Sequence, residues 1–238
     1  MNERTVAVVV GVGPGLGAAV AERFAREKFA VALMARNEAT LAPVEGAIVQ
    51  AGGSALPVPA DVSDPTSLRA AFARVRERLG APDVFVYNAG AFHLAGVLDT
   101  EVADFEQCWR VGCLGAFVGA QEVLPAMLER GRGTLLFTGA TASLRGGVRF
   151  AAFSGGKFAL RALAQSLARE FGPRGIHVAH AIIDGAIDTP RIRAFLPDRE
   201  THTLLSPAAI AEAYWQLHTQ DPSAWTHELD LRPAVETF

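Results

Sequence analysis

The stretch VVVGVGPGLGAAVAERF, residues 8–24, decides the fold of this chain. It passes from a β-branched run, through glycines at alternate positions, into a pattern with helical spacing. Glycines at such a junction permit a tight turn and a close backbone approach to a pyrophosphate, and the helix N-terminus adds N–H groups and a positive dipole. A glycine loop directly after a strand and before a helix therefore predicts a dinucleotide-binding site, against the alternative of a glycine-rich turn without a ligand. The expected contacts are Gly11, Gly13, Gly15, Leu16 and Gly17.

Short β-branched runs alternate with longer helical segments along the rest of the sequence. Strands are expected at residues 5–10, 30–35, 55–59, 84–87, 134–138 and 177–183 and near 228. Helices are expected at residues 16–28, 37–51, 65–79, 102–130, 152–171 and 207–218. This alternation is typical of βαβ units, so we expect a Rossmann-like, doubly wound α/β fold with a parallel sheet of about seven strands and helices on both faces. One domain over residues 1–238 holds the whole pattern, and ligands should bind beyond the carboxyl ends of its strands.

Composition narrows the classes of partner. The 238 residues are 50% hydrophobic and 20% charged, with a formal net charge of −3 and no polybasic run, which argues against a nucleic-acid partner and favours a small molecule. The first apolar run is too short for a signal sequence, and no run of about 18 apolar residues follows, so we expect a cytoplasmic protein without a membrane partner. The two cysteines and six histidines lack metal-ligand spacing, so no metal is expected.

The end of the second expected strand bears on the choice of cofactor. NAD-selective sites place an acid there to hold the ribose hydroxyls, whereas this chain has Ala35 followed by Arg36. A guanidinium suits a 2′-phosphate, so NADP is favoured over NAD. Two alternatives stay open: Arg36 as a solvated loop cation, and NAD binding supported by the nearby Glu38.

The order and spacing of several motifs resemble the short-chain dehydrogenase/reductase superfamily over essentially the whole chain. The matching pieces are the loop from Gly11 to Gly17, Asp61-Val62, Asn88-Ala89-Gly90, Lys157, Asp184-Gly185 and Asp188-Thr189. The resemblance implies that the glycine loop holds the pyrophosphate and that the Asp61 position contacts adenine. It also implies that the Asn88 segment braces the central strand and that the Thr189 position contacts the nicotinamide amide.

Three positions depart from the family's catalytic pattern. The family's proton-donating tyrosine, four residues before the lysine, falls on Phe153, and the serine thirteen residues further upstream falls on Ala140. The family's supporting asparagine falls on Gly112. None of these side chains donates or accepts a proton, although Lys157 can still hydrogen-bond the nicotinamide ribose. The substitute donors considered first are Ser143 and Thr141; Thr138, Ser154, Tyr87, His93 and Asp184 are further candidates.

Two functions remain open at this stage. The first is an NADP-dependent oxidoreductase with a non-standard proton donor, acting on a small carbonyl or an activated alkene. The second is a non-catalytic NADP-binding structural or regulatory protein, because a fold does not guarantee activity.

Two further segments bear on substrate and assembly. The long stretch 188–207 carries Arg191, Arg193 and Arg199, and is expected to be an irregular, mobile lid that could attract an acidic substrate. The helical segments around residues 108–126 and 153–167 are apolar around much of their circumference, so a homodimer or homotetramer is expected.

Overall fold

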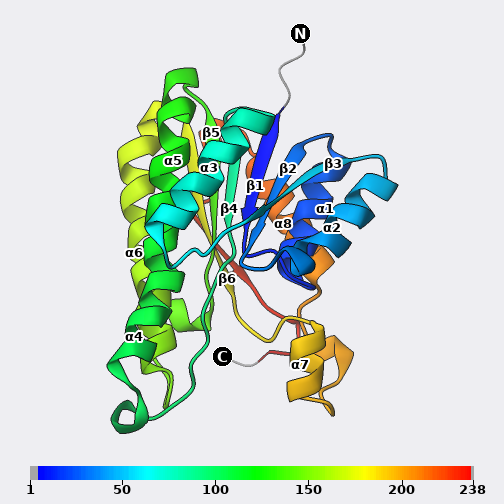
Figure 1. The fold of residues 1–238 in the computed structure, drawn as a ribbon. Helices are drawn as coiled ribbons and strands as arrows, with labels where there is room; N and C mark the ends of the chain where they lie inside the picture. The colour runs from blue at the N-terminus through cyan, green and yellow to red at the C-terminus, as the bar shows by residue number, and fades with distance from the viewer. Residues whose placement is uncertain (1–4, 237–238) are drawn as a thin grey trace.

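A computed structural model describes residues 5–236, so the predicted domain span of 1–238 extends beyond the described residues at both ends. Seven parallel strands form one sheet in the order β3-β2-β1-β4-β5-β6-β7 (Figure 1), which confirms the predicted fold class. The strands are β1 Val6–Val10, β2 Ala30–Ala35, β3 Ser54–Pro59, β4 Val84–Tyr87, β5 Gly133–Thr138, β6 Ile176–Ile183 and β7 Glu228–Leu231. The strand order reverses between β1 and β4, and doubly wound sheets bind their ligands at such a switch point.

Helices cover both faces of the sheet (Figure 1). The longer ones are α1 Leu16–Arg26, α2 Glu38–Gln50, α3 Pro65–Leu79, α4 Val102–Trp109, α5 Gly115–Arg130, α6 Ala151–Phe171, α7 Pro190–Phe195 and α8 Pro207–His218. One apolar cluster joins the sheet to α3, α5 and α6, and a second joins it to α1, α2 and α8. Because both faces are covered, β1 and β4 are apolar and buried at every position.

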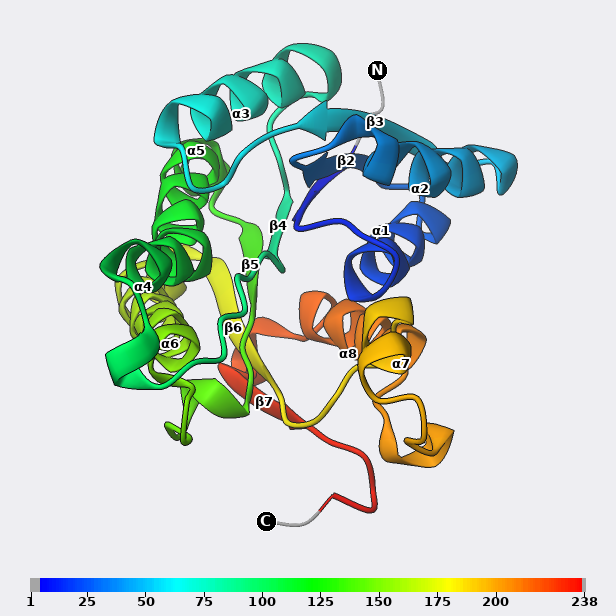
Figure 2. The ribbon, with the colours of Figure 1, turned by 60° about the horizontal axis from the view of Figure 1, so that its bottom comes forward.

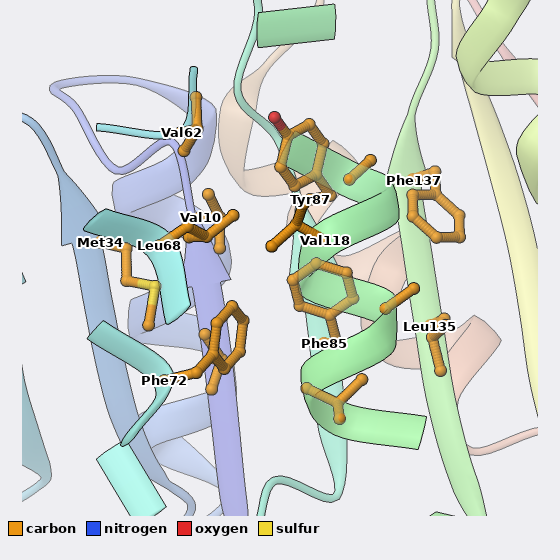
Figure 3. Packing of buried hydrophobic residues seen from close by; sticks show 14 of the residues in the cluster. Val10, Met34, Val62, Leu68, Phe72, Phe85, Tyr87, Val118, Leu135 and Phe137 are labelled. Atoms are coloured by element: carbon orange, nitrogen blue, oxygen red, sulfur yellow. The ribbon is translucent and has the colours of Figure 1, made fainter. Parts of the chain in front are cut away.

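The first cluster forms the larger part of the core. Successive residues of β4 point to opposite faces, and Phe85 and Tyr87 pack on the side of α3 and α5 (Figure 3). Phe72 of α3 meets Phe85 edge to face, with ring centroids 5.9 Å apart, and Phe137 of β5 meets it from the other side at 6.1 Å. This packing fixes α3 and α5 against the centre of the sheet, below the ends of the strands that carry the site.

Two helix starts follow directly from the sequence. Asp64 accepts a hydrogen bond from the backbone N–H of Thr66 at 2.9 Å, with Pro65 in the first turn. Ser206 accepts one from the N–H of Ala209 at 3.4 Å, before Pro207. Each cap satisfies an otherwise unpaired N–H at the point where proline sets a helical φ, which is why these boundaries match the prediction.

The predicted helix over residues 102–130 is continuous, but its middle is a π turn. The segment divides into α4, a π-helical turn at Arg110–Leu114 and α5. The Tyr87 hydroxyl donates a 2.6 Å hydrogen bond to the carbonyl of Val111, which offers this backbone group a partner outside the helical ladder. A Cβ on Gly115 would lie 2.4 Å from the same hydroxyl, so the helix passes Tyr87 as closely as a glycine allows. The π turn accommodates this contact.

Among the described residues, Val102–Arg130 is the one helical stretch that is long and apolar enough, by length and composition alone, to cross a membrane. Half of its most apolar window is buried inside the fold, as expected for a core helix.

Candidate cofactor and catalytic site

A cavity of about 840 Å³ opens at the carboxyl ends of the central strands. Figure 2 turns this edge of the sheet toward the viewer. Its walls come from the loop after β1, the ends of β4, β5 and β6, the segment leading into α6, and α7. The predicted site residues that line it are Gly11, Gly13, Gly15, Leu16, Gly17, Asn88, Gly90, Ala140, Thr141, Phe153, Lys157, Gly185 and Thr189. The structure therefore gathers most of the predicted cofactor and catalytic positions in one place.

The glycine loop is anchored to two neighbouring strands. The backbone N–H groups of Gly11 and Val12 both donate to the carbonyl of Met34 in β2, at 2.9 and 3.0 Å. The Asn88 side chain, after β4, donates to the carbonyl of Gly11 at 2.9 Å. Gly11 has a φ of +89°, and a Cβ there would lie 2.5 Å from the backbone nitrogen of Ala89. Only glycine fits this close approach, and the Asn88 side chain holds the loop against the segment that follows β4.

The rest of the loop presents bare backbone to the cavity. A Cβ on Gly13 would meet no heavy atom within 4 Å, whereas one on Gly15 would lie 2.6 Å from the methyl group of Thr189. A Cβ on Gly17 would lie 2.4 Å from the carbonyl oxygen of Gly11, which holds the start of α1 close to the strand. The loop can thus admit a pyrophosphate against its backbone, with Thr189 beside it.

The residues predicted to contact the adenosine half lie outside this cavity. The pKa of Asp61 is lowered, chiefly because its carboxylate accepts hydrogen bonds from the hydroxyl and N–H of Ser63, at 2.7 and 2.9 Å. The positive charge of the exposed Arg36 contributes to the same shift. Val62 is buried and packs in the core on the side of α3. The N–H of Ala60 donates to the carbonyl of Ala35, which ties the ends of β2 and β3 together beneath these side chains.

Lys157 is the buried cation of the site. Its ammonium donates a 2.7 Å hydrogen bond to the carbonyl of Thr138 at the end of β5, and a Cβ on Gly90 would lie 3.6 Å from the same nitrogen. Burial lowers the pKa of Lys157 to about 8. One of the three ammonium hydrogens is committed to the Thr138 carbonyl, which leaves the others free to serve a ligand.

Three phenylalanines form one wall of the cavity. The ring of Phe153 lies one helical turn from Lys157, with the ammonium 5.9 Å from the ring centroid. The Phe92 ring packs on Phe153 with centroids 5.2 Å apart and on Phe150 at 5.8 Å, and Phe150 and Phe153 lie 6.2 Å apart. Phe92 is 47% exposed, so this aromatic wall has a free face.

Hydrogen bonds decide which nearby hydroxyls remain available. Thr141 lines the cavity, but its hydroxyl donates to Asp184 at 2.5 Å. Ser143 is fully buried outside the cavity lining, and its oxygen accepts from the N–H of Ala140 at 3.1 Å. Ser154 lines the cavity, and its buried oxygen has no hydrogen-bond partner among the described residues. The two substitute donors considered first are therefore engaged elsewhere, whereas Ser154 is not.

The remaining predicted site residues lie at the end of β6 and at Gly112. The Asp184 carboxylate also faces Arg232, at 3.6 Å, and the following Gly185 lines the cavity. Gly112 lies outside the lining, and a Cβ there would sit 3.1 Å from the Cα of Gly156. The backbones of the π turn and α6 meet at this point, so there is no room for a longer side chain unless they separate.

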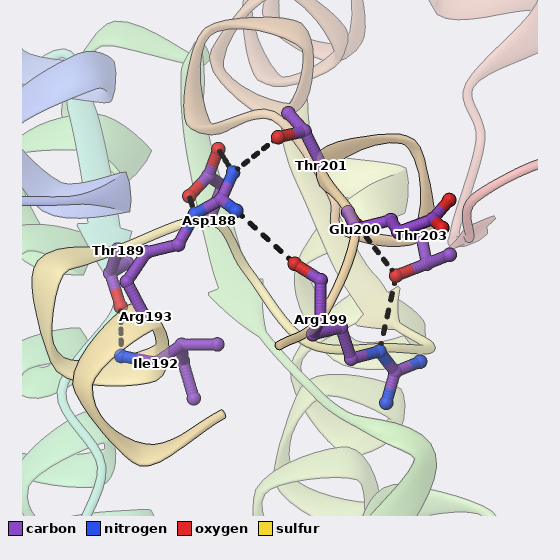
Figure 4. A network of polar contacts seen from close by, with 8 residues as sticks. All are labelled: Asp188, Thr189, Ile192, Arg193, Arg199, Glu200, Thr201 and Thr203. Carbon is purple, nitrogen blue, oxygen red and sulfur yellow. Dashed lines mark hydrogen bonds and ion pairs between the residues drawn. The ribbon is translucent and has the colours of Figure 1, made fainter. Parts of the chain in front are cut away.

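The stretch 188–207 is more regular than predicted, because it contains α7 and a short 3₁₀ turn at Thr201–Thr203. Figure 4 shows why: the Arg193 guanidinium makes two hydrogen bonds to the Asp188 carboxylate, at 2.7 and 2.8 Å, and a third to the hydroxyl of Thr201 at 2.9 Å. Arg199 donates to the Thr203 hydroxyl at 3.2 Å. Of the three arginines predicted here, Arg191 alone lines the cavity.

The sequence analysis did not identify several residues that line the cavity. They are Phe92, Phe150, Phe195 and Arg145. The signal available was the composition of the segment before α6, where Arg145, two glycines and Phe150 lead directly to Phe153.

Comparison with known proteins supports the resemblance to the short-chain dehydrogenase/reductase superfamily. A family model described as short chain dehydrogenase matches residues 5–200. A short-chain dehydrogenase/reductase of Armillaria gallica is 35% identical over 193 residues, covering 80% of this chain and 74% of the relative. The crystal structure of a short-chain dehydrogenase from Rhodopseudomonas palustris is 40% identical, covers 98% of this chain and 100% of its own, and superposes with a TM-score of 0.84. An alcohol dehydrogenase from the archaeon Thermococcus sibiricus, complexed with 5-hydroxy-NADP, is 27% identical over 99% of both chains, with a TM-score of 0.88.

The chain therefore belongs to the short-chain dehydrogenase family, whose members with assigned activities among these relatives are oxidoreductases.

Proposed function

We propose that this protein is an NADP-dependent oxidoreductase that reduces a small carbonyl or an activated alkene with a proton donor other than tyrosine. The observation that carries the proposal is the composition of one cavity. Bare glycine backbone lies at one end, Lys157 is buried in its wall, and Phe153 and Ala140 stand where the family resemblance expects polar catalytic groups. The half of the site that would hold the cofactor keeps the family's glycines, asparagine and lysine, while the half that would hold the reacting oxygen lacks the family's tyrosine and serine.

NADP is preferred in this proposal for two reasons. Arg36 follows the end of β2, where NAD-selective sites carry an acid, and its positive charge contributes to the lowered pKa of Asp61. The Thermococcus sibiricus relative was crystallised with an NADP derivative. The glycine loop fits a dinucleotide because its exposed backbone at Gly13 has open space in front of it.

NADPH, when bound, supplies a hydride to the carbonyl carbon, or to the β carbon of an activated alkene, and becomes NADP⁺. The substrate oxygen, or the α carbon, then needs one proton. Lys157 lines the cavity with uncommitted N–H hydrogens, and its lowered pKa makes a proton easier to release. In the proposal Lys157 gives up this proton and recovers one from water, while the Ser154 hydroxyl donates a hydrogen bond to the substrate oxygen.

The first test is a calorimetric titration of the nucleotide-free protein with NADPH and separately with NADH. We expect micromolar or tighter binding of NADPH and weaker binding of NADH. An Arg36→Gln variant should lose the preference for NADPH without losing affinity for NADH. Absence of binding to either nucleotide would overturn the proposed function.

A second candidate function is a non-catalytic NADP-binding protein with a structural or regulatory role. It is favoured by the apolar character of Phe153, Ala140 and Gly112 together. Turnover separates the two candidates: NADPH oxidation within the ordinary enzyme range of about 1 to 10³ per second on any member of a ketone and enone panel eliminates the non-catalytic role.

We also infer that the protein acts as a homodimer or homotetramer. Support comes from apolar side chains on the outward faces of α4, α5 and α6, of which Phe105, Phe117 and Phe158 are exposed. The cytoplasmic location stays a prediction.

A further inference from the structure

The charged residues that line the cavity are all cations. They are Arg145, Lys157 and Arg191, and no Asp or Glu of the described part of the chain lines it with them. The remaining lining is largely apolar or bare backbone. A cavity of this kind attracts anions, because positive charges beside low-dielectric walls are poorly screened.

The cofactor accounts for two of these cations. Lys157 lies beside Gly90 in the part of the cavity that the resemblance assigns to the nicotinamide ribose. Arg191 follows Thr189 by two residues, and the Thr189 methyl group overlies Gly15 of the glycine loop. Arg191 is therefore placed to meet the phosphates that an NADP molecule brings to that loop.

Arg145 is the cation that the cofactor does not explain. It lies in the segment between Ala140 and Phe150, and its backbone N–H donates a hydrogen bond to the carbonyl of Thr141 at 3.2 Å. Its guanidinium forms no ion pair with any carboxylate of residues 5–236. Arg145 thus lines the cavity with its five donors uncommitted, and its backbone is bonded to Thr141, next to the family's serine position at Ala140.

The aromatic wall supplies the second, independent observation. The Phe92 ring packs edge to face on both Phe150 and Phe153, and all three rings line the same cavity as Arg145. A flat ring entering the cavity would cover the free face of Phe92 and gain both buried apolar area and ring contacts.

We propose that the substrate is an aromatic carbonyl or enone compound with an anionic group, carboxylate or phosphate, whose ring packs on Phe92, Phe150 and Phe153 and whose anion pairs with Arg145. The inference rests on the proposed function, since it names the substrate class of the same site. It assigns Arg145 as the residue that determines specificity for charge.

The test measures binding, so that it does not depend on turnover. The protein saturated with NADP⁺ is titrated by calorimetry with cinnamate, with its neutral isostere cinnamamide, and with phenyl phosphate. We expect at least one of the two anions to bind about tenfold tighter than cinnamamide, as a charge-assisted pair with arginine provides. Which anion binds tighter distinguishes a carboxylate from a phosphate substrate.

Three variants locate the effect. Arg145→Gln should remove the advantage of the anions and leave the affinities for cinnamamide and NADP⁺ unchanged. Arg191→Gln should weaken NADP⁺ binding, and Arg74→Gln, which removes an exposed arginine of α3 away from the cavity, should change nothing. Equal binding of anions and cinnamamide, or an unchanged preference in Arg145→Gln, overturns the inference.

Failure of the proposed function is recognised separately, because NADP⁺ binding is measured first. If NADP⁺ does not bind, the same ligands are titrated against the nucleotide-free protein. The comparison of anions with cinnamamide then decides the inference by the same criterion.

Discussion

At Phe153, the side chain beside the buried ammonium of Lys157 is an apolar ring 5.9 Å from the charge. The ring offers the ammonium a weak cation–π contact in place of a hydrogen bond. The nearest polar partner of Lys157 is instead the backbone carbonyl of Thr138. The site therefore keeps its cation in position without a titratable hydroxyl beside it.

The double substitution Phe153→Tyr with Ala140→Ser should create reduction of plain ketones that the wild-type protein carries out slowly. A tyrosine hydroxyl next to Lys157 supplies a proton donor, and general acid catalysis is typically worth about 10² to 10⁴ in rate. NADPH oxidation with simple ketones measures the effect, and Phe158→Tyr, on an exposed part of the same helix, is the control. A folded, NADPH-binding double variant with no gain would show that the pocket does not place a ketone for hydride transfer.

The buried charge of Lys157 makes stability depend on pH. The pKa of a lysine in the unfolded chain is 10.5, and burial lowers that of Lys157 to about 8. Between these values the unfolded chain binds a proton that the folded chain has lost, so the free energy of unfolding rises as pH increases from about 8 to 10.5. The contribution is at most about 3 kcal/mol.

Urea unfolding of the wild type and of Lys157→Met across this pH range tests the expectation. The wild type should gain stability relative to the variant as pH rises, because the variant has no proton to lose at this position. If the two curves run parallel, the ammonium is better solvated in the folded state than its burial indicates.

Single residues also show what could not be predicted from the sequence. The sequence places Thr141 and Ser143 near Ala140, but it carries no information on their hydrogen-bond partners. Asp184, 43 residues further along the chain, accepts a hydrogen bond from the Thr141 hydroxyl, and the Ser143 oxygen accepts one from the N–H of Ala140. Contacts of this range depend on how β5 and β6 end side by side, which a linear pattern does not specify.

At the scale of elements, α6 is held by a close approach to α4 and the π turn. A Cβ on Gly156 would lie 2.6 Å from the carbonyl oxygen of Cys108. A Cβ on the adjacent Gly155 would lie 3.4 Å from the ring of Phe105, an ordinary contact. The two neighbouring glycines therefore have different roles. Gly156 sets the distance between the helices, and Gly155 does not.

Gly156→Ala should destabilise the fold by about 1–3 kcal/mol, because the methyl group must push α6 away from α4. Gly155→Ala should be neutral or stabilising by up to about 1 kcal/mol, since alanine is the better helix former. Urea midpoints of the two variants and the wild type provide the measurement. Equal effects of the two substitutions would contradict the close helix contact.

The helices also show which features the sequence predicts from local signals and which it does not. The starts at Pro65 and Pro207 follow from a cap residue and a proline, which act within one turn. The π turn at Arg110–Leu114 arises from the hydroxyl of Tyr87 on a distant strand. Apolar spacing over residues 102–130 is helical throughout, so it carries no sign of this tertiary contact.

At the scale of the whole molecule, the architecture follows from strands buried on both faces. The runs of β1 and β4 have no charged residue and are buried at every position, which only a sheet covered on both sides permits. Parallel strands need crossover helices, and these bring the glycine loop, Asn88 and Gly185 to one edge of the sheet. The location of the site was therefore predictable. The side chains that line it depend on loops whose conformation the strand pattern does not specify.

The proposed oligomer is tested through the outward faces of α5 and α6. Phe117 and Phe158 are exposed by 44% and 42%, which is unfavourable for large apolar rings unless another chain covers them. Phe117→Asp together with Phe158→Asp should convert a dimer or tetramer into monomers, because a carboxylate cannot be buried there without a partner. Light scattering after gel filtration gives the mass, and Val49→Asp, at an exposed position of α2 on the opposite face of the sheet, should leave it unchanged. A wild-type protein that elutes as a monomer would contradict the proposal, and assembly that survives the double substitution would place the interface elsewhere.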